Sequence, residues 1–180
     1  MMLTAIALML VAPATTGAAT TDGQTIVVTG TPLSETERRL ADCLARRCPP
    51  AEDIEASAAH AENLFVTGRY DDASTVLRKS IGRNRRYARD LPVPVAGLFR
   101  AHSRVAAHLG EGNQYRASSY EIVRSLRAGL SADDARVIAA RFEVAAMQLS
   151  LGRISLARST YADIAGKALA IGRGNRARLT

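Results

Sequence analysis

Apolar residues recur at helical spacing along most of the chain. Between residues 51 and 67, for example, Ile54, Ala58, Ala61, Leu64 and Phe65 would lie on one side of a helix. The same spacing predicts seven helices, at about 34–46, 51–67, 71–86, 95–109, 115–128, 133–151 and 155–171. The one β-prone run, residues 25–30, is too isolated to form a sheet. We therefore expect an all-α fold, in which one short helix precedes three helical pairs.

Polar residues mark several of the expected helix starts. Ser34 with Glu37, and Ser131 with Asp134, have the spacing of a capping box, so we expect them to cap the first and sixth helices. Asp71 and its neighbour Asp72 place negative charge on the first turn of the third helix, where it suits the helix dipole.

Three glycines indicate an internal repeat. Gly68, Gly110 and Gly152 lie 42 residues apart, and each stands between the two helices of a pair. Small residues lie at fixed distances from the first and third glycines: Ala61 and Ala73, then Ala145 and Ala157. Self-similarity at such a period is typical of stacked repeat proteins. We expect Gly68 to end its helix with a positive φ, and expect Gly68→Val and Ala145→Leu each to destabilise the fold, the latter by about 1–3 kcal/mol.

The middle unit departs from this pattern. Tyr115 stands five residues after Gly110, where the other two units have alanine, and Gly112 stands where they have Tyr70 and Ile154. Shifting the register by two would place Ala117 at the small position. This interpretation predicts a short insertion at the second hinge.

The residues around the first and third glycines resemble the core of a tetratricopeptide (TPR) repeat. Gly68, Tyr70, Ala73 and Leu77 carry the resemblance in the first unit, and Gly152, Ala157 and Tyr161 carry it in the third. The resemblance implies a right-handed α-solenoid of about three helical hairpins with a 42-residue period, over residues 51–172. In this family, the first helix of each pair lines a concave groove that holds a peptide or a partner's helix.

Aligning the sequence with that family implies which residues face the groove. They are Glu55, Ala58, Glu62 and Phe65 in the first unit, Arg100, Arg104 and His108 in the second, and Phe142, Ala146 and Leu149 in the third. Arg100, Arg104 and His108 step by four and so form a cationic stripe along one helix, which could bind carboxylates or could simply be solvated. Ala58 and Glu62 stand where the family's carboxylate clamp has Lys and Asn. The sequence therefore does not predict the binding specificity of TPR proteins that carry this clamp.

The N-terminus is typical of a secretory signal. Residues 2–12 are apolar apart from Thr4, and a small-residue A-x-A site follows at 12–14, although no Lys or Arg precedes the run. We expect a signal peptide at 1–19, a flexible or extended segment at 20–33, and a location in the periplasm or cell envelope. The chain also resembles uncharacterised signal-bearing TPR proteins of alphaproteobacteria, some of which have a TonB-like C-terminal domain that is absent here.

Two cysteines, Cys43 and Cys48, lie in the short helical segment 34–50, before Pro49 and Pro50. Within a continuous helix, residues five apart cannot form a disulfide, but unwinding after Arg46 would bring the sulfurs together. A disulfide in an oxidising compartment and two independent thiols are both compatible with the sequence. A zinc site is not compatible with the sequence, because no further zinc ligands cluster near the two cysteines.

No catalytic motif occurs in the sequence, and we expect a non-enzyme without cofactor or metal. His102 and His108 are six apart and lie on different helix faces, so they do not form a ligand pair. Asp71/Asp72 and Asp133/Asp134 are explained by their places at helix starts.

The net charge of +7 comes almost wholly from arginine. Two functional hypotheses are compatible with the sequence. In the first, the protein is an envelope scaffold that binds a peptide or protein. In the second, a basic surface centred on residues 83–89 binds an anionic polymer or lipid headgroups, or the protein is an accessory module of a TonB-type system. Export excludes nucleic acid as a partner, and the apolar N-terminal run is too short for a stable membrane span.

The last predicted helix, 155–171, carries Leu156, Tyr161, Ile164, Leu169 and Ile171, and only the tail 173–180 follows it. Repeat stacks normally end in a helix with a polar outer face. We therefore expect either that these 180 residues are a fragment, with 173–180 as the start of a further repeat, or that the C-terminal hairpin is covered by self-association.

Overall fold

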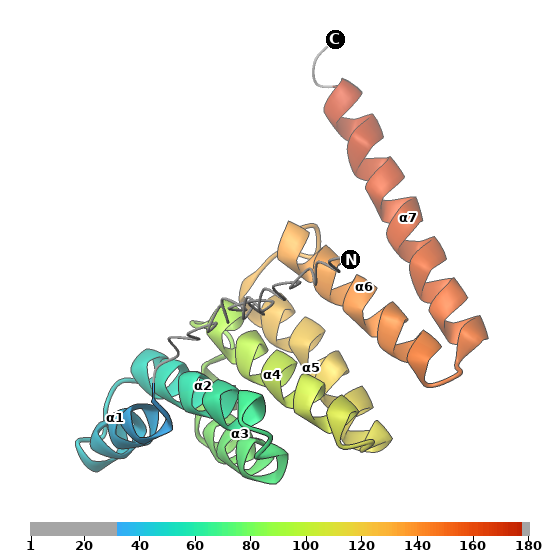
Figure 1. Ribbon diagram of the computed structural model, residues 1–180. Coiled ribbons are helices and arrows are strands. Elements are labelled where there is room, and N and C mark those ends of the chain that lie inside the picture. Colours follow the sequence, from blue (N-terminus) through green and yellow to red (C-terminus); the bar gives the residue numbers. More distant parts are fainter. Residues whose placement is uncertain (1–31, 178–180) are drawn as a thin grey trace, which may run out of the picture. The chain divides into compact units, whose positions relative to one another are not determined.

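A computed structural model describes residues 32–177 of the chain, and all of the regular structure within them is helical. Seven α-helices and one short 3-10 helix follow one another along the chain (Figure 1). Their bounds are α1 Leu33–Ala45, α2 Pro50–Val66, α3 Tyr70–Asn84, η1 Arg85–Tyr87, α4 Pro92–His108, α5 Gly112–Gly129, α6 Ala135–Ser150 and α7 Ile154–Ala177. The expected all-α class and the seven predicted helices are confirmed over these residues. The predicted signal peptide, residues 25–30 and most of the predicted extended segment lie outside them.

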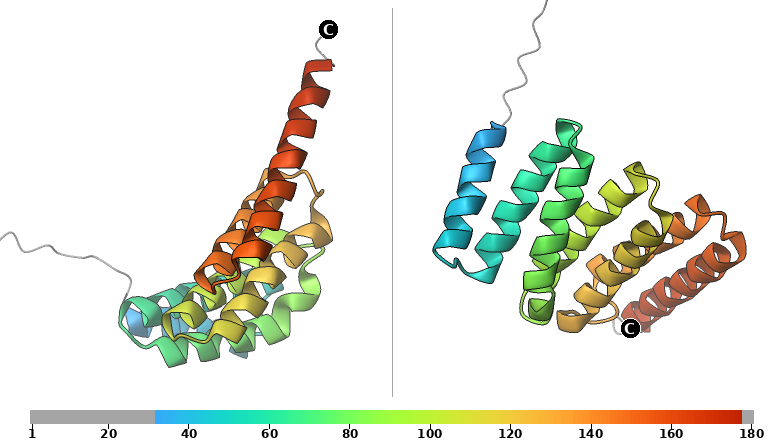
Figure 2. Two further views of the ribbon diagram at one scale, coloured as in Figure 1. Left: turned by 90° about the vertical axis from the view of Figure 1, so that its right-hand side faces the viewer. Right: turned by 90° about the horizontal axis from the view of Figure 1, so that it is seen from below.

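Each helix packs against the next one in the chain, and α2 also contacts α4. Figure 2 shows the helices side by side in chain order, from α1 at one end to α7 at the other. The C-terminal part of α7 runs beyond α6 and continues to Ala177, past the predicted end at residue 171 (Figure 1).

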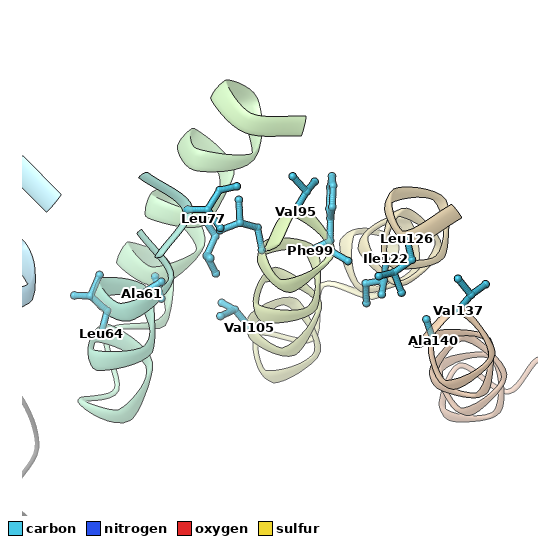
Figure 3. Close-up of a cluster of buried hydrophobic side chains, with 14 residues drawn as sticks. Ala61, Leu64, Leu77, Val95, Phe99, Val105, Ile122, Leu126, Val137 and Ala140 are labelled. Atoms are coloured by element: carbon cyan, nitrogen blue, oxygen red, sulfur yellow. The ribbon is translucent and has the colours of Figure 1, made fainter. Parts of the chain in front are cut away.

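One continuous apolar core joins α2 to the start of α6. Its residues include Leu64 on α2, Leu77 on α3, Val95 on α4, Ile122 on α5 and Val137 on α6, all nearly inaccessible to solvent (Figure 3). A smaller cluster of Leu40, Cys43 and Ala56 joins α1 to α2. Burial of the apolar face of each helix against its neighbours is what holds such an arrangement together.

The three hinge glycines end α2, α4 and α6 in the same way. Gly68, Gly110 and Gly152 have φ values of 79°, 72° and 71°, and the amide of the residue after each bonds back to a carbonyl of the preceding helix. This is the left-handed helix ending in which glycine is favoured because it has no Cβ. The positive φ expected at Gly68 is confirmed, and the other two glycines share it.

The predicted insertion in the middle unit is wrong. Helices α3, α5 and α7 begin at Tyr70, Gly112 and Ile154, each two residues after its hinge glycine, so the three hinges have equal length. In the middle unit, with no shift in register, a large residue stands where the first unit has a small one, and a small residue stands where it has a large one. Tyr115 takes the place of Ala73 and is partly buried, while Ser119 takes the place of Leu77 and is buried; Ala117 is exposed.

Two predicted caps are also wrong. Helix α1 begins at Leu33 after Pro32, without a side-chain cap, and α6 is capped by the Asp134 carboxylate, which accepts a hydrogen bond from the amide of Arg136. The side-chain hydrogen bonds from Arg136, together with this amide, lower the pKa of Asp134 to about 2. Capping depends on the loop conformation before the helix, which residue spacing does not determine.

Candidate functional site

Glu62 on α2 and Arg104 on α4 form an ion pair on one exposed surface of the helices. The two residues are 42 positions apart, one repeat period. The Arg104 guanidinium also lies over the ring of Phe65, 4.6 Å from its centre. Arg104 therefore contacts the carboxylate and the aromatic ring together, which fixes the guanidinium between α2 and α4.

Three rings gather beside this pair. The ring centres of Phe65 and His108 are 5.6 Å apart, and Tyr70 at the start of α3 lies 5.3 Å from Phe65 and 3.9 Å from His108. The cluster joins α2, α3 and α4 close to the first hinge. The alignment with the TPR pattern named Phe65 and His108 as groove residues, and the structure adds Tyr70 as a neighbour of both.

Arg100, one turn before Arg104, makes a second link between helices. Its guanidinium donates to both carboxylate oxygens of Glu143 on α6, at distances of 3.0–3.2 Å. Sequence reasoning missed Glu143, although a signal was present: it lies 43 residues after Arg100, close to one period. Arg100 and Arg104 are both neutralised by acids of neighbouring helices, so the predicted cationic stripe carries less charge than its sequence indicates.

Phe142 is next to Glu143 on α6 and lies farther along the same surface. Its side chain is 47% exposed, and its ring centre is 5.9 Å from that of Tyr161 on α7. Leu149 and Ala146 on α6 are exposed as well. An exposed Phe and Leu seven residues apart form an apolar strip along one side of the helix, and such strips often mark a binding surface.

We call these residues of α2, α4 and α6 the α2–α4–α6 surface: Glu62, Phe65, Arg100, Arg104, His108, Phe142, Glu143, Ala146 and Leu149. The two ion pairs connect it from α2 through α4 to α6. Exposed pairs of this kind contribute about 0.2–1 kcal/mol each, so their main effect is to position the side chains rather than to hold the fold together. Chemically, the surface offers paired charges that link α2, α4 and α6, with aromatic side chains beside them.

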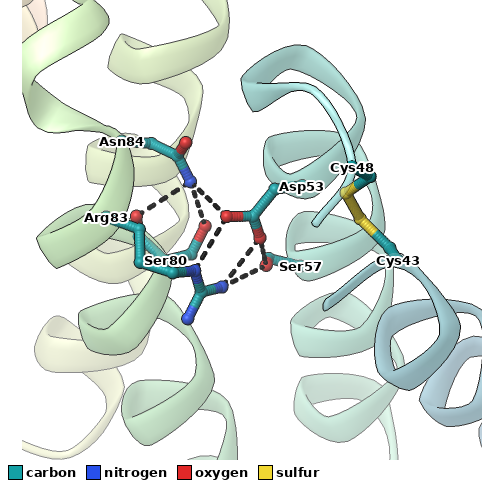
Figure 4. Close-up of polar contacts among 7 residues, drawn as sticks. All are labelled: Cys43, Cys48, Asp53, Ser57, Ser80, Arg83 and Asn84. Carbon is teal, nitrogen blue, oxygen red and sulfur yellow. Dashed lines mark hydrogen bonds and ion pairs between the residues drawn. A yellow bond between two sulfur atoms is a disulfide. The ribbon is translucent and has the colours of Figure 1, made fainter. Parts of the chain in front are cut away.

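The basic run 83–89 is only partly available to a ligand. Arg83 donates two hydrogen bonds to the Asp53 carboxylate, at 2.7 and 2.8 Å, and buried Asn84 donates a third (Figure 4). Burial alone would raise the pKa of Asp53, but the hydrogen bonds from Arg83, Asn84 and Ser57 outweigh burial and lower that pKa. Arg83 thus joins α3 to α2 and belongs to the fold.

Exposed charge remains on the other arginines of this run. Arg86 lies over the ring of Tyr87, with its guanidinium carbon 4.8 Å from the ring centre, and Arg85 and Arg89 are exposed. The basic surface of the second hypothesis is therefore smaller than the sequence indicates.

A disulfide joins Cys43 and Cys48 next to this network, with 5.0 Å between the two Cα atoms (Figure 4). Helix α1 ends at Ala45, and Arg47 adopts a positive φ of 53° in the turn that follows. The helix unwinds before Cys48, as a bridge between these positions requires.

The histidines do not form a catalytic arrangement with one another. His60 and His102 are buried, and His108 is exposed. Burial lowers the pKa of His60 and of His102. His102 Nδ1 bonds the Ser118 hydroxyl at 2.7 Å, whereas its Nε2 has no hydrogen-bond partner among the described residues. Within residues 32–177, no three His, Cys, Asp or Glu side chains are grouped so that they could hold a metal ion.

Compared with known proteins, the chain matches no protein-family model and no curated protein sequence. Over the part of the chain that the structure describes, no helix has the length and apolar character needed to cross a membrane.

Proposed function

We propose that the protein is a non-enzymatic scaffold of the TPR type, a right-handed α-solenoid that binds a peptide or protein partner across its α2–α4–α6 surface. One observation carries the proposal: residues from corresponding places on three helices lie on one surface, linked by the Glu62–Arg104 and Arg100–Glu143 pairs. The three equal hinges and their 42-residue spacing support the repeat architecture.

The chemistry of this surface favours a partner with both polar and apolar groups. Phe142 and Leu149 would supply apolar contacts, and aromatic anchors typically dominate the energy of such interfaces. The ion pairs of Arg100 and Arg104 would orient the partner's polar groups and would add specificity more than affinity.

The cell envelope is the compartment we propose. Support comes from the signal-like residues 1–19 and from the Cys43–Cys48 disulfide, because disulfides persist in oxidising compartments such as the periplasm.

A second candidate function, binding of an anionic polymer or lipid headgroups, rests on the exposed Arg85, Arg86 and Arg89. The two functions predict opposite mutational patterns. The full chain, immobilised and exposed to envelope extract, should lose its partner on Phe142→Ser and keep it when Arg85, Arg86 and Arg89 are changed together to Gln. Retention by Phe142→Ser with loss in the triple variant would refute the proposal and support the second function.

Salt provides an independent readout of the same choice. Binding to a polyanion weakens steeply as salt rises, because each neutralised charge releases a counterion. Contacts to Phe142 and Leu149 should keep most of their affinity between about 50 and 500 mM salt. A complex that survives in the triple variant but dissociates at high salt would contradict an apolar anchor.

A further inference from the structure

A cavity of about 610 Å³ opens between α5, α6 and α7, away from the residues that define the α2–α4–α6 surface. Its apolar wall is formed by Val123 and Ala128 of α5 and by Val144 of α6. A volume of this size lies within the range of about 300–1,000 Å³ that is typical of small-molecule sites.

The polar groups inside the cavity already have partners. The Gln148 side chain is 2% exposed; its amide nitrogen donates to the Tyr120 hydroxyl at 3.0 Å, and its oxygen accepts from the Thr160 hydroxyl at 3.0 Å. A ligand need not satisfy these groups. The inner part of the cavity is therefore suited to a hydrocarbon group, because filling it with apolar atoms leaves no polar atom of Gln148 unpaired.

Positive charge surrounds the same cavity. Arg124, Arg127 and Arg141 line it, and no carboxylate does. Arg124 is paired with Glu121 and Arg141 with Asp163, both outside the lining. Arg127 is exposed and forms no hydrogen bond or ion pair with any residue that the structure describes.

The arginines that line the cavity differ in how firmly they are held by their partners. The Arg124 side chain is 80% exposed, and its pair with Glu121 is of the i,i+3 kind, which is weak in water. Arg124 can therefore turn to a stronger anion at little cost, whereas Arg141, with a side chain 19% exposed and bound to Asp163, is held in place.

We propose that this cavity binds a single-chain amphiphile with an anionic head, such as a fatty acid or an alkyl phosphate. The hydrocarbon chain would lie against Val123, Ala128 and Val144. The carboxylate or phosphate would accept hydrogen bonds from Arg127 and Arg124, since guanidinium groups bind both anions through paired N–H donors. The site needs both halves of the ligand and is distinct from the peptide surface proposed above.

The direct test is isothermal titration of the full chain with dodecanoate, below its micelle concentration. We expect saturable binding of one molecule per chain. Butanoate, which has the head but a short chain, should not bind, and dodecanol, which lacks the charge, should bind at least tenfold more weakly. Titration with dodecyl phosphate distinguishes a carboxylate-specific site from a general anion site, and binding of either anion fits the proposal.

Two variants locate the site. Arg127→Gln removes a charged donor that forms no hydrogen bond or ion pair with the described residues, and should weaken dodecanoate binding about tenfold, the effect of losing one hydrogen bond to a charged group. Ala128→Phe, at an exposed position, should fill the cavity and abolish binding. Arg38→Gln on α1 is the matched control, an exposed arginine outside the cavity, and should bind like the parent.

Thermal melts establish that each variant is folded. Arg127→Gln decides the proposal even if Ala128→Phe is unstable, because Arg127 is exposed and forms no hydrogen bond or ion pair with the described residues. Equal binding by the parent and Arg127→Gln would overturn the proposal, as would many molecules bound per chain or no binding by the parent.

Discussion

The helices α2–α5 and the hairpin of α6 with α7 have the same hinge geometry but differ in how well they are covered. In the first region, Leu64, Leu77 and Leu98 are at most 2% exposed, although Val66, the last residue of α2, is 67% exposed. In the hairpin, Leu149 is 46% exposed, Ile154 69% and Leu169 61%. The difference shows that apolar residues at helical spacing form each hairpin, whereas their burial also depends on contact with further helices.

Not every apolar residue of the α6–α7 hairpin is exposed to solvent. The sequence predicts that the apolar residues of the last helix, Ile164 among them, are not covered by a following helix. Ile164 is only 2% exposed, so this expectation is wrong for that residue. Ala145 on α6 and Ala157 on α7 are fully buried, so small residues near the hinge let the two helices approach closely. Self-association through the remaining exposed residues stays a prediction.

Matched leucine substitutions should show the largest contrast between the two regions. Leu77→Ala creates a cavity in the continuous core, and the free energy of unfolding should fall by about 2–5 kcal/mol. Leu149→Ala removes a half-exposed side chain, and the loss should stay below about 1 kcal/mol. Urea unfolding followed by circular dichroism measures both. Equal losses would mean that Leu149 is covered in solution, as self-association predicts.

Matched aspartate substitutions should show the next largest difference. Asp53→Ala removes the acceptor of Arg83 and of one N–H of the buried Asn84 amide, whose nitrogen still donates to the Ser80 carbonyl, and should cost about 2–3 kcal/mol. Asp163→Ala removes a solvent-exposed partner of Arg141 and should cost clearly less than Asp53→Ala, because water screens the exposed pair. The same urea experiment applies. A cost for Asp53→Ala as small as that for Asp163→Ala would show that the buried network adds no net stability.

Two helical glycines should respond in opposite directions. A methyl group at Gly129, at the end of α5, would overlap the carbonyl oxygen of Arg89, so Gly129→Ala should destabilise by about 1–3 kcal/mol. Gly166 on α7 has open space around it, and Gly166→Ala should stabilise α7 by about 0.5–1 kcal/mol. Thermal melts of both variants provide the comparison. Stabilisation by Gly129→Ala would show that α5 does not approach Arg89 so closely.

The smallest expected effect is the pH dependence of the first region, which contains all three histidines. Burial lowers the pKa of His102, and Arg78 lowers it further, although Glu111 acts in the opposite direction. Below about pH 6.5 the unfolded chain therefore binds a proton at this residue more readily than the folded chain, so stability should fall as pH drops from 7 towards 5. His102→Gln should flatten this slope in melts across that range. A parent whose stability rises in this window would contradict the direction of the shift.

The sequence predicted the helices because each carries apolar residues at helical spacing, and predicted the hinge at Gly68 because glycine is favoured where φ is positive. Predictions failed where side chains from different helices meet. Tyr115 and Ser119 exchange sizes relative to Ala73 and Leu77, which is a packing compensation that a search for one small position misses.

The candidate site was predictable in part. Glu62, Phe65 and Arg104 were named together from their repeat positions, and they do lie together. The pairing of Arg100 with Glu143 could not be predicted from the spacing of residues along α4 alone, because the pair joins two helices. The cavity by Arg127 was not foreseen either, because it depends on the gap that remains between α5, α6 and α7, and no residue pattern encodes that gap.

The Cys43–Cys48 disulfide has a mechanical consequence. If the protein is pulled from its N-terminal side, α1 can be unravelled by force only as far as Cys43, because the bridge then carries the load directly to Cys48, two residues before α2 begins at Pro50. The turn between them cannot extend, and each of its residues would otherwise add about 3.3–3.6 Å to the stretched chain. The pulling force thus reaches α2 after less chain has been extended than the number of backbone residues would suggest. Reduction of the disulfide would let the turn between the two cysteines extend as well.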